Sequence, residues 1–182
     1  LIPDIDRSLL PILETRKNKK KLFLVITADR GMAGAFNSNI IKKAEKEVSE
    51  FGIENSYIIC IGKKAHDYFK RRDFNVLEVH KNFWNSLEIE IALEIGRSIV
   101  DRFINNEIDS VDVIYNEFVN VGRQKTMCKL FLPISYQSNE KVPCELLYEP
   151  SKEEVVKTLI PKHLNIQLWQ FLLESNASEQ AA

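Results

Sequence analysis

The residues in this sequence that are best placed to do chemistry lie in a short turn with two glycines. Asp29, Arg30, Gly31 and Gly34 follow an apolar run, Leu22–Thr27, of the kind that forms a strand buried on both faces. In doubly wound α/β proteins, ligands bind where a strand runs into the next helix, because backbone N–H groups there can hold a phosphate. A nucleotide-binding enzyme or sensor that uses the Gly31–Gly34 loop is therefore one hypothesis for this chain.

The spacing of the glycines argues against that hypothesis. A dinucleotide-binding turn has the pattern G-x-G-x-x-G, whereas this turn has only Gly31-x-x-Gly34, and the G-K-[ST] phosphate loop is absent from the sequence. A dinucleotide enzyme also has an acid for the ribose hydroxyl after its second strand, but here Ile61 is followed by Gly62 and Lys63. The pattern favours the competing interpretation, in which the two glycines permit a tight turn and a close approach of strand and helix.

Other side chains with catalytic or metal-binding potential are scattered along the sequence. The histidines are His66, His80 and His163, and the cysteines are Cys60, Cys128 and Cys144. They lack metal-site spacing, the cysteines contain no C-x-x-C pair, and the patterns G-x-S-x-G and H-E-x-x-H do not occur. An odd number of cysteines without a pairing pattern indicates a reducing compartment. We therefore predict no catalytic residue, no cofactor and no metal.

Length and charge narrow the class of protein further. The 182 residues suit one domain with appendages, and 45% apolar and 28% charged residues are ordinary for a globular protein. A formal net charge of −1 argues against a nucleic-acid partner, because phosphate binding needs a marked basic excess. The sequence begins at Leu1 and ends in a helical pattern at Ala182, so we expect it to be a piece of a longer protein.

Apolar runs and helical periodicities alternate along most of the chain. The predicted strands are Leu22–Thr27, Tyr57–Ile61, Val76–Val79, Val111–Tyr115 and Met127–Leu132. The predicted helices run from a cap at Asn37 or Ser38 to about Glu50, over Lys63–Arg72 and Leu87–Asn105, and from a capping box at Ser151 and Glu154, with Pro161 starting or kinking a further helix.

This alternation predicts an α/β fold: a Rossmann-like, three-layer domain with a mostly parallel five-stranded sheet. The last two strands are joined only by residues 116–126, which carry no helical pattern. A parallel crossover needs about a dozen residues or more, usually including a helix, so we predict that this connection is a hairpin. The fifth strand is then an antiparallel edge strand.

Four motifs in the same order resemble the gamma subunits of F-type ATP synthases. Ile26–Asn37 resembles the family's strand and turn, S-D-R-G-L-C-G-x-[FY]-N, with Met32 and Ala33 where Leu and Cys are common. Val113–Phe118 resembles the fourth-strand segment. The other two motifs are Leu147–Ser151, similar to the family's Y-E-P turn, and Asn176–Ala182, similar to its N-A-S-E-[HQ]-A-A. Together the motifs span most of the chain.

The resemblance implies a non-catalytic subunit of the central stalk, which transmits torque between a membrane rotor ring and the catalytic subunits. It implies the Rossmann-like body of that shaft, without most of the two long helices that form the family's coiled coil. Residues 1–18 would then end an N-terminal helix and form a linker, residues 19–150 would form the globular domain, and residues 151–182 would begin the C-terminal helix. No extra cysteine-bearing insertion is present, so the thiol regulation of the chloroplast form is not implied.

The resemblance also implies partners and contact residues. The partners are the epsilon subunit, the membrane rotor c-ring and, through the coiled coil, the alpha/beta catalytic ring, at the cytoplasmic face of a bacterial cell membrane. Tyr148 and Glu149 match the foot near the c-ring and epsilon, although Glu149 could equally be a charge favoured by a helix N-terminus. Glu179 is the candidate near the catalytic ring. Basic candidates for epsilon or an acidic membrane surface are Lys63, Lys64 and Arg71, and a solvated face is the alternative for each.

Overall fold

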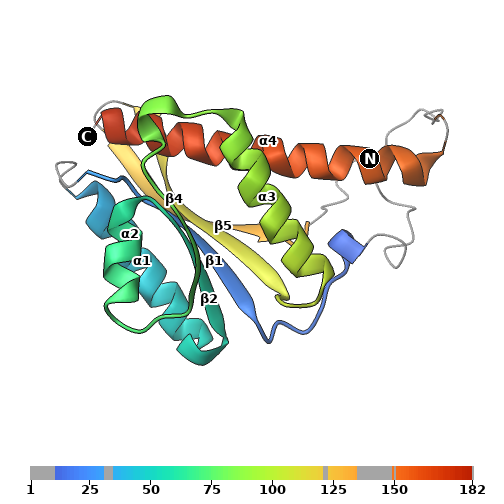
Figure 1. The fold of residues 1–182 in the computed structure, drawn as a ribbon, viewed down its shortest axis with the longest axis horizontal. Coiled ribbons are helices and arrows are strands. Elements are labelled where there is room, and N and C mark those ends of the chain that lie inside the picture. The colour runs from blue at the N-terminus through green and yellow to red at the C-terminus, as the bar shows by residue number, and fades with distance from the viewer. Residues whose placement is uncertain (1–10, 31–34, 121–122, 135–148, 150, 182) are drawn as a thin grey trace.

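A computed structural model describes residues 11–30, 35–120, 123–134, 149 and 151–181. Their central feature is a five-stranded sheet with the strand order β3-β2-β1-β4-β5 (Figure 1). The strands are β1 (Lys21–Ile26), β2 (Ser56–Ile61), β3 (Val76–His80), β4 (Ser110–Asn120) and β5 (Arg123–Leu132). The first four are mutually parallel and β5 pairs with β4 in the antiparallel direction, which confirms the predicted mixed sheet.

Helices cover both faces of this sheet, so the fold has the three predicted layers. The helices are α1 (Phe36–Phe51), α2 (Lys63–Lys70), α3 (Ile89–Ile104) and α4 (Lys152–Gln180), with short 3₁₀ turns at Pro11–Leu13, Ile53–Asn55 and Trp84–Ser86. In Figure 1, α1 and α2 lie on one face, and α3 and α4 cross each other on the other. Among the described helices, none is long and apolar enough to cross a bilayer.

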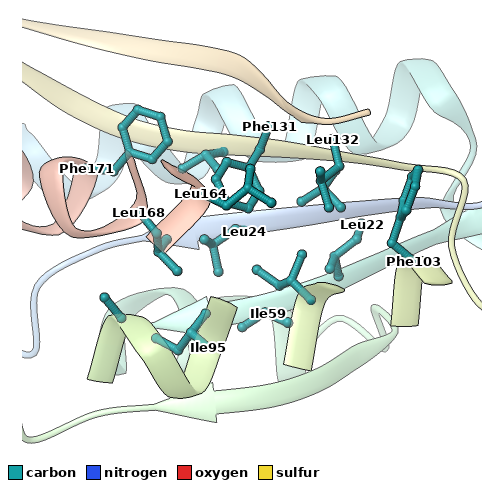
Figure 2. Packing of buried hydrophobic residues seen from close by; sticks show 14 of the residues in the cluster. Leu22, Leu24, Ile59, Ile95, Phe103, Phe131, Leu132, Leu164, Leu168 and Phe171 are labelled. Carbon is teal, nitrogen blue, oxygen red and sulfur yellow. The ribbon is translucent and has the colours of Figure 1, made fainter. Parts of the chain in front are cut away.

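The core divides into two clusters because neighbouring side chains of a strand point to opposite faces. On β1, Leu22 and Leu24 face α3 and α4, whereas Phe23 and Val25 face α1 and α2. All four side chains have no exposed surface. Figure 2 shows the larger cluster, where Leu168 of α4 lies near Leu24. Burial on both faces explains why this strand reads as an unbroken apolar run.

The start of α1 differs from the prediction. The helix begins at Phe36 with Ala35 at the N-cap, so neither Asn37 nor Ser38 is the cap. Asn37 lies in the first turn, where its Oδ1 accepts from the Ala28 N–H at 2.9 Å and its Nδ2 donates to the Arg30 carbonyl at 3.1 Å. Its side chain therefore holds the turn after β1, instead of satisfying the helix's own backbone.

The β4–β5 hairpin is longer than the apolar pattern indicated. Pairing continues through polar residues that were assigned to the connection, including Asn116 opposite Thr126 and Glu117 opposite Lys125. Thr126 Oγ1 donates to Asn116 Oδ1 at 2.7 Å. Such cross-strand pairs stabilise a hairpin without an apolar run.

Helix α4 passes through the proline that was predicted to interrupt it. It runs unbroken over 29 residues with Pro161 inside, so no separate helix starts there. The loss of one backbone hydrogen bond at Pro161 is offset by burial of Ile160 and Leu164 on either side of it. At its start, Ser151 Oγ accepts from the Glu154 N–H at 3.2 Å, which confirms the predicted cap.

Candidate functional site

The turn after β1 is built around one carboxylate. The two oxygens of Asp29 accept from separate backbone groups, Oδ1 from the Lys63 N–H at 2.8 Å and Oδ2 from the Asn82 N–H at 2.7 Å. Lys63 follows β2 and Asn82 follows β3, so Asp29 ties together the carboxyl ends of three neighbouring strands. Gly31 and Gly34, on which the nucleotide hypothesis depends, lie outside the described residues.

The residue after β2 is a glycine because the chain passes very close to β1. Gly62 has a φ of 92°, and a Cβ there would lie 2.6 Å from the Thr27 carbonyl carbon. Thr27 itself is fully buried, and its Oγ1 donates to the Ile61 carbonyl at 3.1 Å and accepts from the Ala65 N–H at 2.9 Å. A dinucleotide enzyme has an acidic residue after its second strand. Here close backbone packing requires a glycine, Gly62, at the position after β2.

A polar hollow of about 320 Å³ lies at these strand ends. It is lined by Asp29, Arg30, Lys63, Asn82, Trp84, Asn85, Glu179 and Gln180. Burial raises the pKa of Glu179 above its ordinary value, and the charge of Asp29 raises it further, while Arg30 acts in the opposite direction. The structure therefore brings two of the predicted contact residues, Lys63 and Glu179, to one hollow.

The C-terminal end of α4 is fixed against the β4–β5 hairpin. Ser178 has no exposed surface, and its Oγ donates to the Asn116 carbonyl at 3.1 Å. Gln124 Nε2 donates to the Ser178 carbonyl at 2.8 Å. Sequence reasoning missed the contacts of these three residues. The helical spacing of the buried residues of α4, which continues from Leu164 and Leu168 through Ser175 to Ser178, could have indicated that Ser178 faces the body.

This arrangement covers the place where doubly wound proteins bind ligands. In such sheets the crevice lies at the strand ends where the order reverses, here between β1 and β4. Ser178 binds β4, and Glu179 lines the hollow together with Asp29. The end of α4 thus forms one wall of the hollow at these strand ends.

The remaining predicted contact residues lie elsewhere. Lys64 is half-buried at the start of α2, and Arg71 is exposed at its end. Glu149 is exposed, and with residues of the first two turns of α4, among them Leu159, it lines a separate hollow of about 260 Å³. Tyr148 lies outside the described residues. The candidates therefore do not form one site.

Helix α4 also carries an apolar stripe on its outer side that sequence reasoning missed. Leu159, Ile166 and Leu173 recur at seven-residue intervals and are 55%, 54% and 43% exposed. The buried positions of the same helix, such as Leu164 and Leu168, lie on a different side of it. A helix with apolar residues on two sides has one of them available to a second partner.

The described thiols are poorly suited to chemistry. Burial raises the pKa of Cys60 to about 12. Burial and the negative charge of Asp112 raise the pKa of Cys128 to about 12. A protonated thiol is a weak nucleophile and a weak metal ligand. Within the described part of the chain, no cluster of three or more His, Cys, Asp or Glu side chains could hold a metal ion.

Comparison with known sequences identifies relatives over nearly the whole chain. The sequence model of a family described as ATP synthase matches residues 4–182. The ATP synthase gamma chain of Chloroherpeton thalassium is 38% identical over 196 residues, which cover 98% of this chain and 64% of the relative. That of Prosthecochloris aestuarii is 38% identical over 185 residues, covering 98% and 63%. The chain therefore spans somewhat less than two thirds of these relatives.

Comparison with solved structures shows that the fold is similar to those of ATP synthase central-stalk structures. The central stalk and c-ring structure of the Tetrahymena thermophila mitochondrial ATP synthase matches with a TM-score of 0.74 at 20% identity, over 97% of this chain and 78% of that one. The rotor of the Euglena gracilis mitochondrial enzyme matches with a TM-score of 0.66 at 18% identity, over 96% and 71%. From the family match and these relatives, the chain belongs to the ATP synthase gamma chain family.

Proposed function

We propose that this chain is the body of a non-catalytic central-stalk subunit of an F-type ATP synthase, which transmits torque between a membrane rotor ring and the catalytic subunits. The names of its relatives support this proposal, because they are ATP synthase gamma chains. The proposal rests mainly on α4, which packs on the body along one side and exposes an apolar stripe on another.

The outer stripe of α4 has the spacing of one heptad position of a coiled coil. Residues that recur every seven positions stay in register with a second helix that winds around the first. Leu159, Ile166 and Leu173 have this spacing, and each exposes at least two fifths of its surface. We propose that a second long helix of the complete subunit packs on them, and that this coiled coil reaches the alpha/beta catalytic ring.

The inner side of α4 joins that helix rigidly to the body. Leu164, Leu168 and Leu172 are fully buried in the larger core cluster. At Gly96 of α3, a Cβ would lie 2.5 Å from Asn165 Oδ1, so the two helices cross very closely there. With 29 residues at about 1.5 Å each, α4 is roughly 43 Å long. A helix of that length, packed along one side, can carry torque without a flexible joint.

We propose three parts for the chain: residues 1–18 as the end of an N-terminal helix and a linker, residues 19–150 as the body, and residues 151–182 as the start of the coiled-coil helix. The body would contact the epsilon subunit and the c-ring as a peripheral component at the cytoplasmic face of the membrane. The commitment of Asp29 to backbone N–H groups and the high pKa of both described thiols support a non-catalytic role.

The contact residues are proposed on the same basis. Tyr148 and Glu149 would face the c-ring and epsilon, and the position of Glu149 beside the start of α4 supports a contact at that end of the helix. Glu179 would face the catalytic ring from the other end of α4. Lys63, Lys64 and Arg71 would face epsilon or the membrane surface.

Ion pumping by the complete enzyme tests the role of α4. In the full-length subunit, Leu159, Ile166 and Leu173 are changed together to serine, and the enzyme is assembled in membrane vesicles. We expect ATP hydrolysis to continue while ATP-driven ion pumping falls at least tenfold, because the helix pair no longer transmits torque. A control variant replaces Ile53, Ile104 and Leu130, which are similarly exposed apolar residues outside α4, by serine. Unchanged pumping per ATP in the α4 variant, or an equal loss in the control, would contradict the proposal.

A further inference from the structure

A hollow of about 400 Å³ lies between α2 and β3, away from the strand-end hollow and from α4. It is lined by His66, Lys70, Asp73, Phe74, Val76 and Val79. Phe74, Val76 and Val79 are half-buried against the smaller core cluster, so they give the hollow an apolar floor. His66 and Lys70 come from α2. We call α2, β3 and the turn between them, residues 63–80, the α2–β3 surface.

Strand β3 lies at the edge of the described sheet, and its pairing is irregular. Ile58 of β2 pairs with Val76, but the next residue, Ile59, pairs with Glu78, so Leu77 is an extra residue. Such a bulge turns one side chain out of the regular alternation of the strand. It also hinders another strand from pairing with this edge of the sheet. Leu77 is exposed, next in sequence to a residue that lines the hollow. Recognition here would therefore rest on side chains, not on strand addition.

The α2–β3 surface is basic, although the whole chain is not. Residues 63–80 contain five lysines and arginines and three acidic residues, a balance of +2, whereas the complete chain has a net charge of −1. Within the described residues, these five cations form no ion pair with a carboxylate. Arg72 instead lies over the ring of Tyr68, 3.8 Å from its centre. Lys70 and Asp73 line the hollow, and Arg71 and Arg72 lie between them in sequence, whereas Lys63 lines the strand-end hollow. Cations beside a hollow with an apolar floor are complementary to an acidic segment with an apolar side chain.

We propose that the α2–β3 surface docks an acidic segment of a partner protein, and that one bulky apolar side chain of that segment enters the hollow. The basic side chains would steer and orient the segment, and the apolar anchor would supply most of the binding energy, as in other interfaces. His66 also lines the hollow, and its buried Nδ1 lies 3.4 Å from Asp67 Oδ1 without forming a hydrogen bond. This inference rests on charge and shape and does not depend on the proposed function, but it gives Arg71, proposed above to face epsilon or the membrane surface, one kind of partner.

The shape of the site favours a protein over a lipid surface. A basic face that lies on a membrane presents its apolar residues outward to the acyl chains. Here three of the apolar residues form the floor of a hollow, and Leu77 is the one large apolar side chain that the described residues of this surface expose. A single inserted side chain matches this arrangement, and binding to anionic lipid vesicles is the alternative that the experiment must separate.

NMR titration of the isotope-labelled 182-residue chain tests the proposal. The probe is the capped peptide Glu-Asp-Glu-Leu-Glu-Asp-Glu, with a second peptide in which Ala replaces the central Leu. We expect the first peptide to shift amide signals of residues 63–80 and to bind at least tenfold more tightly than the second. Binding should also weaken at least fivefold between 50 and 200 mM salt, because several charges take part. Equal binding of the two peptides, or shifts that map elsewhere, would overturn the proposal.

Charge-reversal variants complete the test. Lys70→Glu with Arg71→Glu should weaken binding of the Leu peptide at least tenfold. Lys42→Glu with Lys46→Glu makes the same change of charge on exposed positions of α1 and should leave binding within twofold. Equal losses in the two variants would show that only net charge matters and would overturn the proposal. Vesicles of phosphatidylglycerol that shift residues 63–80 while the peptide does not would assign the surface to lipid and would overturn it as well.

Discussion

Replacing Gly62 by alanine tests whether close backbone packing, and not ligand binding, requires a glycine after β2. At the φ of 92° found there, an added Cβ would lie 2.6 Å from the Thr27 carbonyl carbon and 2.8 Å from Thr27 Oγ1. Neither strand can easily move apart, because the Thr27 N–H donates to the Ile61 carbonyl and the Gly62 N–H to the His80 carbonyl, both at 2.7 Å. The substitution must therefore strain the backbone and push two strands apart.

The size of the effect follows from these two contributions. Gly62 combines a φ of 92° with a ψ of 150°, a conformation that is essentially limited to glycine and costs a residue with a Cβ roughly 1–3 kcal/mol. Forcing extra atoms into a packed interior adds about 1–3 kcal/mol. We expect Gly62→Ala to lower the free energy of unfolding by about 2–6 kcal/mol, a large share of the roughly 5–15 kcal/mol that stabilises a typical domain.

Gly52→Ala is a matched control in which only the backbone conformation, and not overpacking, should cost stability. Gly52 also has a positive φ, 114°, but the nearest atoms to an added Cβ belong to the carboxylate of Glu54, at 2.9 Å or more. That side chain is flexible and can move, so we expect a loss of only about 1–3 kcal/mol from the backbone. Urea unfolding followed by far-UV circular dichroism measures both variants. If Gly62→Ala proves no more destabilising than Gly52→Ala, the packing explanation for Gly62 is wrong.

Three further predictions follow from contacts within the fold. Ser178→Ala leaves the buried Asn116 carbonyl without this donor, so we expect a loss of about 1–2 kcal/mol and faster amide exchange in the last two turns of α4, by exchange mass spectrometry. Burial raises the pKa of Glu78, but hydrogen bonds from serine and arginine side chains of α3 outweigh it and hold the pKa below its ordinary value. The ionised Glu78 therefore contributes stability above its unfolded pKa of about 4.3, and this contribution is lost as the pH falls through the folded pKa. Glu78→Gln lacks this carboxylate, so between pH 6 and 3 its free energy of unfolding in urea should fall less than that of the unchanged protein. Cys60 and Cys128, each with a pKa raised to about 12, should resist alkylation by iodoacetamide at pH 8 in the native state, and rapid labelling in peptide mass spectra would contradict their burial.

The sequence predicted most of the sheet because the relevant signals are local. Unbroken apolar runs such as Leu22–Thr27 mark strands that are buried on both faces, and the short link after Tyr115 required an antiparallel last strand. The errors arose where tertiary contacts override local preference. Asn37 binds the preceding turn instead of capping α1, and burial on both sides of Pro161 keeps α4 continuous.

The candidate site was less predictable than the fold. Asp29, Lys63 and Glu179 are far apart in sequence, and only the order of the strands and the path of α4 bring them to one hollow. The outer stripe of α4, which includes Ile166, was missed because the sequence pattern does not say which apolar residues of a helix the body will cover. The bulge at Leu77 depends on the pairing register of β3 and has no local signal.

We propose that this body turns with the shaft, and rotation can be observed in single enzyme molecules. The assembled enzyme is fixed to a surface through its catalytic ring, and a bead is attached to a cysteine introduced at Ile53, an exposed position on the body. We expect the bead to turn in one direction while ATP is hydrolysed and to stop when ATP is removed. A bead that stays still while the same molecules hydrolyse ATP would show that this body does not turn with the shaft.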